Sequence, residues 1–81
     1  MRITVRLFAR LRELAQADAL TVEVPATATV GDVWRAVTDE VPALAPFEGA
    51  ISCAVNANFS RMSNPVAAGD DVAFLPPVSG G

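Results

Sequence analysis

The sequence predicts an α+β fold in which one long helix packs on one face of a mixed sheet. Two segments near the start, 1–8 and 19–24, alternate between apolar and other residues, as half-buried strands do. One amphipathic segment, 30–41, has its apolar residues at helical spacing, and more strand-like segments follow it. Strands before and after a single covering helix are typical of a small domain with one helix layer.

The first strand, 1–8, places its odd-numbered apolar residues on one face and arginine and threonine on the other. Phe8 departs from this pattern because it adds an aromatic ring to the arginine side. Residues 9–17 are good helix formers with leucines at helical spacing, so a short helix or turn is expected there. The second strand, 19–24, alternates again and ends at Pro25.

The long helix has recognisable start and stop signals. Thr29 suits the N-cap position, and Asp32 three residues later makes a variant of the capping box. Pro42 stops the helix. Its apolar stripe is rich in valine, a mediocre helix former, so packing on the sheet must stabilise it. The stripe consists of Val30, Val33, Trp34, Val37 and Val41.

The remaining strands lie in the second half of the chain. A loop with two prolines and a glycine, 42–49, leads to a third strand, AISCAVN, at 50–56. Residues 57–63 fit a short fourth strand or a turn, and a glycine-aspartate turn at 68–71 precedes a final strand at 72–75. The core face of the third strand is expected to contain Ile51, Cys53 and Val55.

The ubiquitin-like β-grasp is the small fold that best fits this order of elements. It places the first and last strands side by side and parallel. We therefore expect a β-grasp domain at 1–75, followed by an extended C-terminal tail at 76–81.

Composition argues against several classes of function. At 81 residues, 52% of them hydrophobic, the chain has room for one folded domain and no second one. Its net charge is −3 and its six arginines are scattered, so nucleic-acid binding is not expected. No stretch approaches a membrane span, and the start lacks the build of a signal peptide. We expect no membrane association and a cytoplasmic location, which a single cysteine also suits.

The sequence contains almost no catalytic side chains. It has no histidine, lysine or tyrosine, which excludes histidine-based acid–base catalysis and Schiff-base lysine chemistry. A metal site is not expected, because Cys53 is the one cysteine or histidine ligand. By its parity in the third strand, Cys53 is interpreted as an inert core residue. Trp34 is likewise assigned to the core, and Asp70 and Asp71 to the turn before the last strand.

Three segments of the chain resemble one known family. They are LFARLREL at 7–14, AVN at 54–56 and GDDVAFLPPVSGG at 69–81. Over essentially its whole length, the chain is similar to molybdopterin synthase small subunits, which are sulfur carriers of the molybdopterin/thiamine ubiquitin-like family. The last segment is the most specific, since AVN and the glycine-aspartate turn occur across related sulfur carriers.

The resemblance implies a carrier that acts as the sulfur-donating subunit of molybdopterin synthase. A ubiquitin-activating-like adenylyltransferase would consume ATP to adenylate the carboxylate of Gly81, and a sulfur donor protein would lead to a thiocarboxylate. The large subunit would receive the tail, and the sulfur would pass to a pterin precursor to make molybdopterin. The implied assembly is a heterotetramer of two small and two large subunits, with no tightly bound cofactor.

The residue types of the tail suit this chemistry. Prolines fix φ and favour an extended arm, and a glycine next to the end allows close backbone approach. Adenylation gives a carboxylate a good leaving group, which a sulfur nucleophile replaces. The alternative is a frayed terminus with no function. The residues predicted to bind in the partner are Pro76, Pro77, Val78, Ser79 and Gly80, ahead of the reactive Gly81.

A partner surface is expected on the side of the sheet away from the long helix. By parity, Phe8 and Leu75 lie opposite the core residues of their strands, and Phe59 is placed with them. Exposed apolar clusters of this kind mark partner sites. The alternative is that the 9–17 segment covers them.

Other functions remain open at this point. Sulfur carriers of the same fold serve thiamine, cysteine or tRNA thiolation, and a ubiquitin-like modifier would need only an isopeptide bond at Gly81. Without lysine, this chain cannot build lysine-linked chains on itself. A plain interaction domain would never be activated by ATP. The stretch NANFSRMSNPVAA departs from the family pattern, so its partner contacts stay open.

Overall fold

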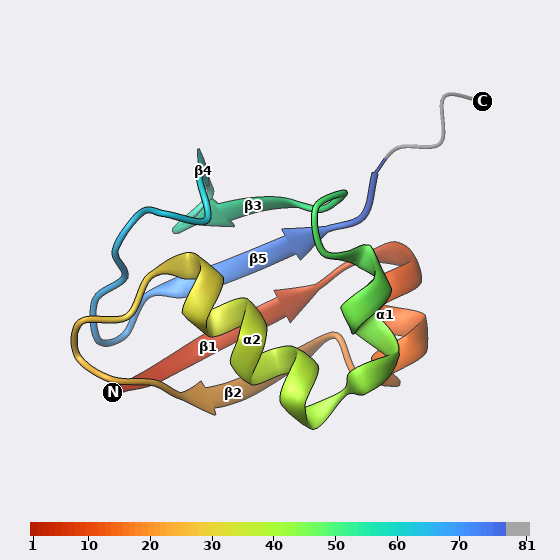
Figure 1. Cartoon of the computed structure of the whole chain (residues 1–81), viewed down its shortest axis with the longest axis horizontal. Coiled ribbons are helices and arrows are strands. Elements are labelled where there is room, and N and C mark those ends of the chain that lie inside the picture. The colour runs from red at the N-terminus through yellow and green to blue at the C-terminus, as the bar shows by residue number, and fades with distance from the viewer. Residues whose placement is uncertain (78–81) are drawn as a thin grey trace.

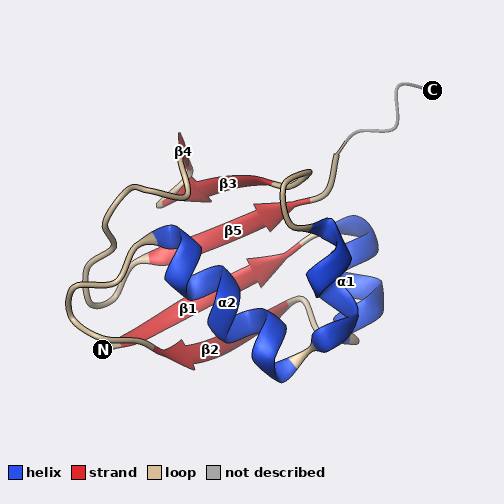
Figure 2. Cartoon of the chain, in the orientation of Figure 1, coloured by secondary structure: helices blue, strands red, loops and turns tan. Residues whose placement is uncertain are grey.

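Five strands form one mixed sheet in the order β2-β1-β5-β3-β4 in this computed structural model, which describes residues 1–77 (Figures 1 and 2). β1 (Arg2–Leu7) is antiparallel to β2 (Ala19–Glu23) and parallel to β5 (Asp71–Leu75). β3 (Ser52–Val55) is antiparallel to both β5 and β4 (Asn58–Ser60). The prediction that the first and last strands are parallel neighbours is therefore confirmed.

The long helix α2 (Val30–Glu40) lies across one face of the sheet, as Figure 1 shows. Its predicted capping box is complete. The backbone N–H of Asp32 donates to Thr29 Oγ1 over 3.3 Å, and the backbone N–H of Thr29 donates to Asp32 Oδ2 over 2.9 Å. Thr29 Oγ1 also donates to Asp32 Oδ2 over 3.2 Å. The two hydrogen bonds that the Asp32 carboxylate accepts from Thr29, first the backbone one and then the side-chain one, lower its pKa because they favour the charged form.

Residues 1–77 also contain two shorter helical segments. α1 (Ala9–Ala15) is the short helix expected after the first strand. The segment after α2, predicted as a loop, instead forms the 3₁₀ helix η1 (Pro42–Phe47). Pro42 suits its first position, where no backbone N–H is needed, and Leu44 is fully buried. No helix within residues 1–77 has the length and apolar character needed to cross a membrane.

The core lies between α2 and the inner face of the sheet, which we define as the side that α2 covers. The rings of Trp34 on α2 and Phe74 on β5 meet edge to face, with centroids 4.9 Å apart. The predicted helical stripe is confirmed, except that Val41, which caps the helix, is only partly buried. The core residues that are 0% exposed are Ile3, Val5, Leu11, Val30, Val33, Val37, Leu44, Val72 and Phe74.

The third and fourth strands are shorter than the segments predicted for them. β3 begins at Ser52, so it does not include Ile51. Of the three residues expected in the core, Cys53 is buried. Ile51 and Val55 pack partly against the core. Residues 57–63 contain the three-residue strand β4 at 58–60, with turn residues before and after it, so both predicted alternatives are present there.

The connection between β4 and β5 runs back over the start of α2. The backbone N–H of Val30 donates to the Asn64 carbonyl over 2.9 Å, and that of Gly31 donates to the Met62 carbonyl over 2.8 Å. These bonds satisfy two of the N–H groups that the first turn of a helix leaves unpaired. A Cβ at Gly31 would lie 3.3 Å from the Met62 carbonyl oxygen, so glycine permits this close approach.

Candidate functional site

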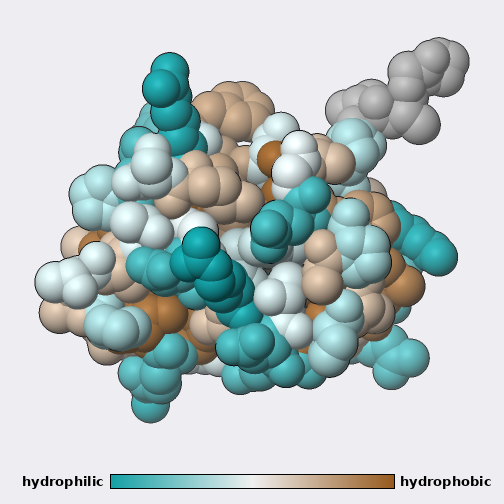
Figure 3. All heavy atoms as spheres, viewed as in Figure 1, coloured by the Kyte–Doolittle hydropathy of each residue, from teal (hydrophilic) through white to brown (hydrophobic). Residues whose placement is uncertain are grey.

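The outer face of the sheet, the side away from α2, is built from alternate residues of the same strands. Figure 3 looks onto the opposite, helix-covered side, where hydrophilic residues run over α2. On the outer face, Arg6 is paired with Ala73, Ala73 with Ala54, and Ala54 with Phe59. Because directly opposed residues point to the same side of a sheet, these four side chains form one row across four strands.

All three residues predicted to contact a partner lie on this outer face. Phe59 is 84% exposed and Phe8 is 43% exposed, while Leu75 is partly buried. Phe8 and Leu75 each follow a residue of the directly opposed pair Leu7 and Phe74, so they occupy neighbouring positions. Phe59 lies farther across the sheet, on β4. The strand β3, on which Ala54 is the direct partner of Phe59, separates β4 from β5. Their role in binding a partner stays a prediction.

A groove of about 290 Å³ opens on the outer face. Ala73 contributes a small side chain to it, and Arg6 Nε donates to Asp71 Oδ2 over 2.7 Å beside it. This ion pair compensates both charges, and the surface that lines the groove is mostly apolar. Sequence reasoning missed the groove because its walls come from β1, β5 and the β3–β4 turn. Its lining residues are Arg6, Phe8, Asn56, Ala57, Asp71 and Ala73.

The turn between β3 and β4 consists of Asn56 and Ala57, which have φ values of 50° and 72°. Type I′ hairpin turns require positive φ at both central positions, and asparagine is favoured at the first of them. Ala57 has no such preference and is held in a sparsely populated region. The asparagine of the AVN segment therefore has a structural role in the turn.

The single cysteine has the properties of a core residue, as predicted. Cys53 is buried, and its Sγ donates to the carbonyl oxygen of Ser60 over 3.1 Å. Burial raises the pKa of the Cys53 thiol, so the reactive thiolate is disfavoured. Cys53 is therefore a poor candidate for covalent sulfur chemistry.

The tail leaves the sheet at the end of β5. The strand ends at Leu75, and Pro76 and Pro77 follow it outside the ladder. Pro76 is partly buried and Pro77 is exposed. The other predicted tail residues, Val78, Ser79, Gly80 and Gly81, lie outside the described residues.

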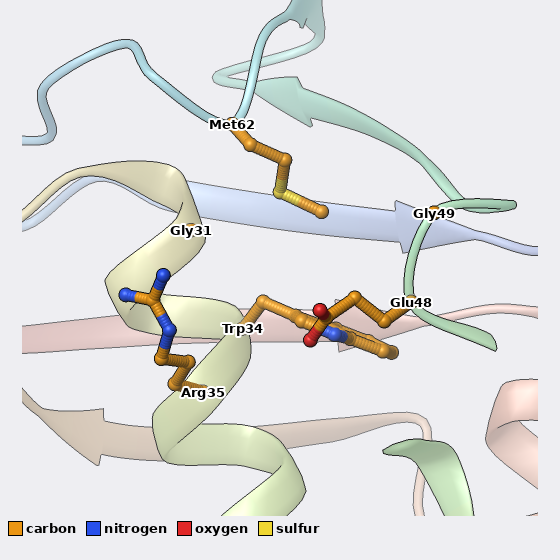
Figure 4. Close-up of a pocket in the computed structure, with 6 residues that line it drawn as sticks. All are labelled: Gly31, Trp34, Arg35, Glu48, Gly49 and Met62. Carbon is orange, nitrogen blue, oxygen red and sulfur yellow. The ribbon is translucent and has the colours of Figure 1, made fainter. Parts of the chain in front are cut away.

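A second cavity, of about 260 Å³, lies on the helix side of the molecule (Figure 4). Trp34 lines it, and the Trp34 Nε1 donor has no hydrogen-bond partner within residues 1–77. No predicted site residue contributes to this cavity. The sequence did not reveal it because its walls come from α2, the loop after η1 and the β4–β5 connection. The lining residues are Gly31, Trp34, Arg35, Glu48, Gly49 and Met62.

Comparison with known proteins assigns the chain to a family. The sequence model of the ThiS family matches residues 5–81, which is nearly the whole chain. The chain belongs to the ThiS family. The resemblance found in the sequence is thereby confirmed, and the match includes both the β-grasp domain and the tail.

Two relatives are similar to this ThiS-family chain over nearly its whole length. The molybdopterin synthase sulfur carrier subunit of Escherichia coli is 38% identical over 81 residues, which cover 98% of this chain and 99% of that protein. Small archaeal modifier protein 1 of Haloferax volcanii is 36% identical over 84 residues, covering 94% of this chain and 97% of the relative.

Solved structures confirm the ubiquitin-like β-grasp fold. The crystal structure of the same Haloferax volcanii modifier matches with a TM-score of 0.91 at 34% identity, covering 100% of both chains. A complex of subunits 1 and 2 of molybdopterin-converting factor from Helicobacter pylori matches with a TM-score of 0.69. At 24% identity, this second match shows the fold alone.

Proposed function

We propose that this ThiS-family chain is the sulfur-carrier subunit of a molybdopterin synthase. The observation that carries the proposal is the match to the Escherichia coli sulfur carrier subunit, which covers 98% of one chain and 99% of the other. The family match also runs through residue 81, so it includes the PPVSGG segment in which the proposed reactive group lies.

The proposed chemistry takes place at the carboxylate of Gly81. An adenylyltransferase joins this carboxylate to the α-phosphate of ATP and releases pyrophosphate. A hydrosulfide ion then attacks the acyl carbon and expels AMP, and the product is a thiocarboxylate. Sulfur in this form is a better nucleophile than the carboxylate oxygen that it replaced, and it passes to the pterin precursor. The chain's own side chains take no proton in these steps.

The proposed partners dock on the outer face. An exposed Phe59, a half-exposed Phe8 and a partly buried Leu75 provide apolar area at one face of the sheet. Aromatic residues are enriched at protein interfaces, and clusters of them mark binding sites. The Helicobacter pylori relative was solved as a complex of two subunits, which supports a large-subunit partner here. A heterotetramer of two small and two large subunits in the cytoplasm belongs to the same proposal.

The test follows the mass of the carrier through activation and transfer. The full chain is incubated with its adenylyltransferase, ATP and sulfide, and its intact mass is measured. It should gain the mass difference between sulfur and oxygen, and then lose it on addition of the large subunit and the pterin precursor. If the mass gain does not occur, or if it persists with the large subunit, the proposal is wrong.

A protein modifier is the second candidate, because the small archaeal modifier protein 1 is nearly as similar to the chain. A modifier would join the Gly81 carboxylate to an amine of another protein, whereas a carrier would release sulfur and return as a carboxylate. The same assay separates them. Formation of covalent conjugates with other proteins in the presence of ATP, without transfer to the pterin, would favour the modifier.

A further inference from the structure

The β3–β4 turn is tied to the start of β5 by the side chain of one residue. Asn56 Oδ1 accepts a hydrogen bond from the backbone N–H of Asp71 over 3.0 Å, and Asn56 Nδ2 donates to Asp70 Oδ1 over 3.0 Å. The backbone N–H of Asn56 also donates to the Asp71 carbonyl over 2.8 Å. Three hydrogen bonds from one residue thus join two turns that are far apart in the sequence.

The other end of this connection is also fixed. Asp70 Oδ2 accepts from the backbone N–H of Ala67 over 2.8 Å, so the carboxylate that meets Asn56 is itself oriented. Asp71 is held on its other side by Arg6 Nε at 2.7 Å. The turn is therefore anchored to a part of β5 that has its own partners, and we call Asn56, Asp70 and Asp71 the asparagine clip.

We propose that Asn56 is a positioning residue for partner docking, because the asparagine clip sets the place of Phe59 and the shape of the outer-face groove. The inference rests on the proposed function, since it concerns the same docking face. Asn56 lies at the edge of this face. Its main effect on affinity comes from holding Phe59 in place.

Phe59 needs such support because of its location. β4 contains three residues and pairs with β3 alone, at one edge of the sheet. Phe59 is 84% exposed, so packing within the described chain does little to hold its ring. The ladder with β3 and the turn that precedes Asn58 hold one end of the strand, and the Met62 bond to Gly31 holds the connection that follows it. A turn that moved would therefore carry Phe59 with it.

The groove depends on the same turn. Asn56 and Ala57 line it on one side, and Arg6, Asp71 and Ala73 line it from the neighbouring strands. The asparagine clip joins these two sides, because Asn56 bonds directly to Asp71. If the two side-chain bonds are lost, only the backbone bond from Asn56 to Asp71 and the β3–β5 ladder join the sides, and the groove loses part of its defined width.

The position of Asn56 also allows its side chain to be tested apart from its backbone. Its φ of 50° is a conformation that glycine adopts without cost. Asn56→Gly should therefore keep the turn while it removes both side-chain hydrogen bonds. Asn64→Gly is the matched control, since it removes another exposed asparagine side chain, in the β4–β5 connection and outside the groove lining.

The experiment measures binding of the full-length carrier to the large subunit by calorimetry. We expect Asn56→Gly to weaken binding by roughly three- to tenfold, the equivalent of one hydrogen bond at tenfold per 1.4 kcal/mol. Asn64→Gly should bind within about twofold of the wild type. A similar loss of affinity in both variants would point to a general effect of replacing asparagine by glycine and would overturn the proposal.

A double-mutant cycle separates positioning from a general structural role. If Asn56 acts through Phe59, then Asn56→Gly should cost almost nothing more in a chain that already carries Phe59→Ala. Combined with Leu75→Ala, at the other end of β5, its effect should remain and should add. Thermal unfolding of each variant reports any change in stability independently of binding.

The outcomes distinguish this inference from the proposed function. Normal binding by Asn56→Gly, or full additivity with Phe59→Ala, would overturn the positioning role alone. If Phe8→Ala, Phe59→Ala and Leu75→Ala all bind normally, the docking face itself is wrong and the inference falls with it.

Discussion

The inner and outer faces of the sheet are made from the same strands and have nearly opposite chemistry. On the inner face, Val5, Val72 and Phe74 are 0% exposed. On the outer face, their chain neighbours Arg6 and Leu75 are exposed or partly exposed. Hydrophobic stabilisation is proportional to the apolar area removed from water, so it is concentrated on the inner face. The outer face is thereby left available for docking.

The polar contacts of the outer face add little to this balance. The Arg6–Asp71 pair, at 2.7 Å, has side chains that are 53% and 37% exposed. Exposed ion pairs of this kind contribute on the order of 0–1 kcal/mol. Substitutions on the outer face should therefore alter binding more than stability. Substitutions on the inner face should alter stability more than binding.

The largest expected effect is that of deleting Gly81. Deleting it would shorten the tail by about 3.3–3.6 Å, the length of one extended residue. Misplacement by about 1 Å can already cost about a hundredfold in rate, so sulfur loading should fall by at least that factor. Intact mass after incubation with the adenylyltransferase, ATP and sulfide measures it. Cys53→Ser is the control and should load normally, whereas loading of the shortened chain would refute the role of Gly81.

The next largest effect should come from the inner face. Phe74→Ala removes a fully buried ring that packs on Trp34, and such truncations cost about 3–5 kcal/mol of unfolding free energy. Urea unfolding followed by circular dichroism would measure the loss. A cost below about 1 kcal/mol would mean that the Trp34–Phe74 contact does not hold the two layers together, as this account requires.

The residue that follows Phe74 in the chain should show the opposite behaviour. Leu75→Ala and Phe8→Ala should weaken binding of the large subunit by about 2 kcal/mol each, because well-packed interface anchors cost this much when truncated. Their unfolding free energies should change far less than that of Phe74→Ala. Calorimetric binding and urea unfolding on the same samples test the comparison. Normal binding by both variants would place the docking face elsewhere.

The smallest effect concerns pH and the cap of α2. Because hydrogen bonds lower the pKa of Asp32 below 3.8 in the folded chain, its contribution to stability is present above that pH. It is lost as the pH falls through the folded pKa, because the protonated form gives up these bonds. Asp32→Asn should therefore flatten the decline of stability in the acid range. Urea unfolding of the wild type and of Asp32→Asn across that range measures how stability depends on pH. The same dependence in both chains would mean that the capping box is unimportant.

Local signals in the sequence were enough to predict most elements. The period-two pattern of 1–8, the start of α2 at Thr29 and its stop at Pro42 all depend on residues close together in the chain. The 3₁₀ helix η1 was missed because its two prolines indicated a loop, whereas burial of Leu44 stabilises a helical turn. Short segments of this kind are decided by packing and not by local preference.

By itself, the sequence determined the β-grasp class, the core stripe of α2 and the identity of the residues on each face, since alternation assigns each strand residue to one side. Only the tertiary structure decided which outer residues meet. The row from Arg6 to Phe59 and the clip from Asn56 to Asp71 depend on the register of strands far apart in the chain. Register is set by how the buried faces of all the strands fit together, and no local pattern contains that information.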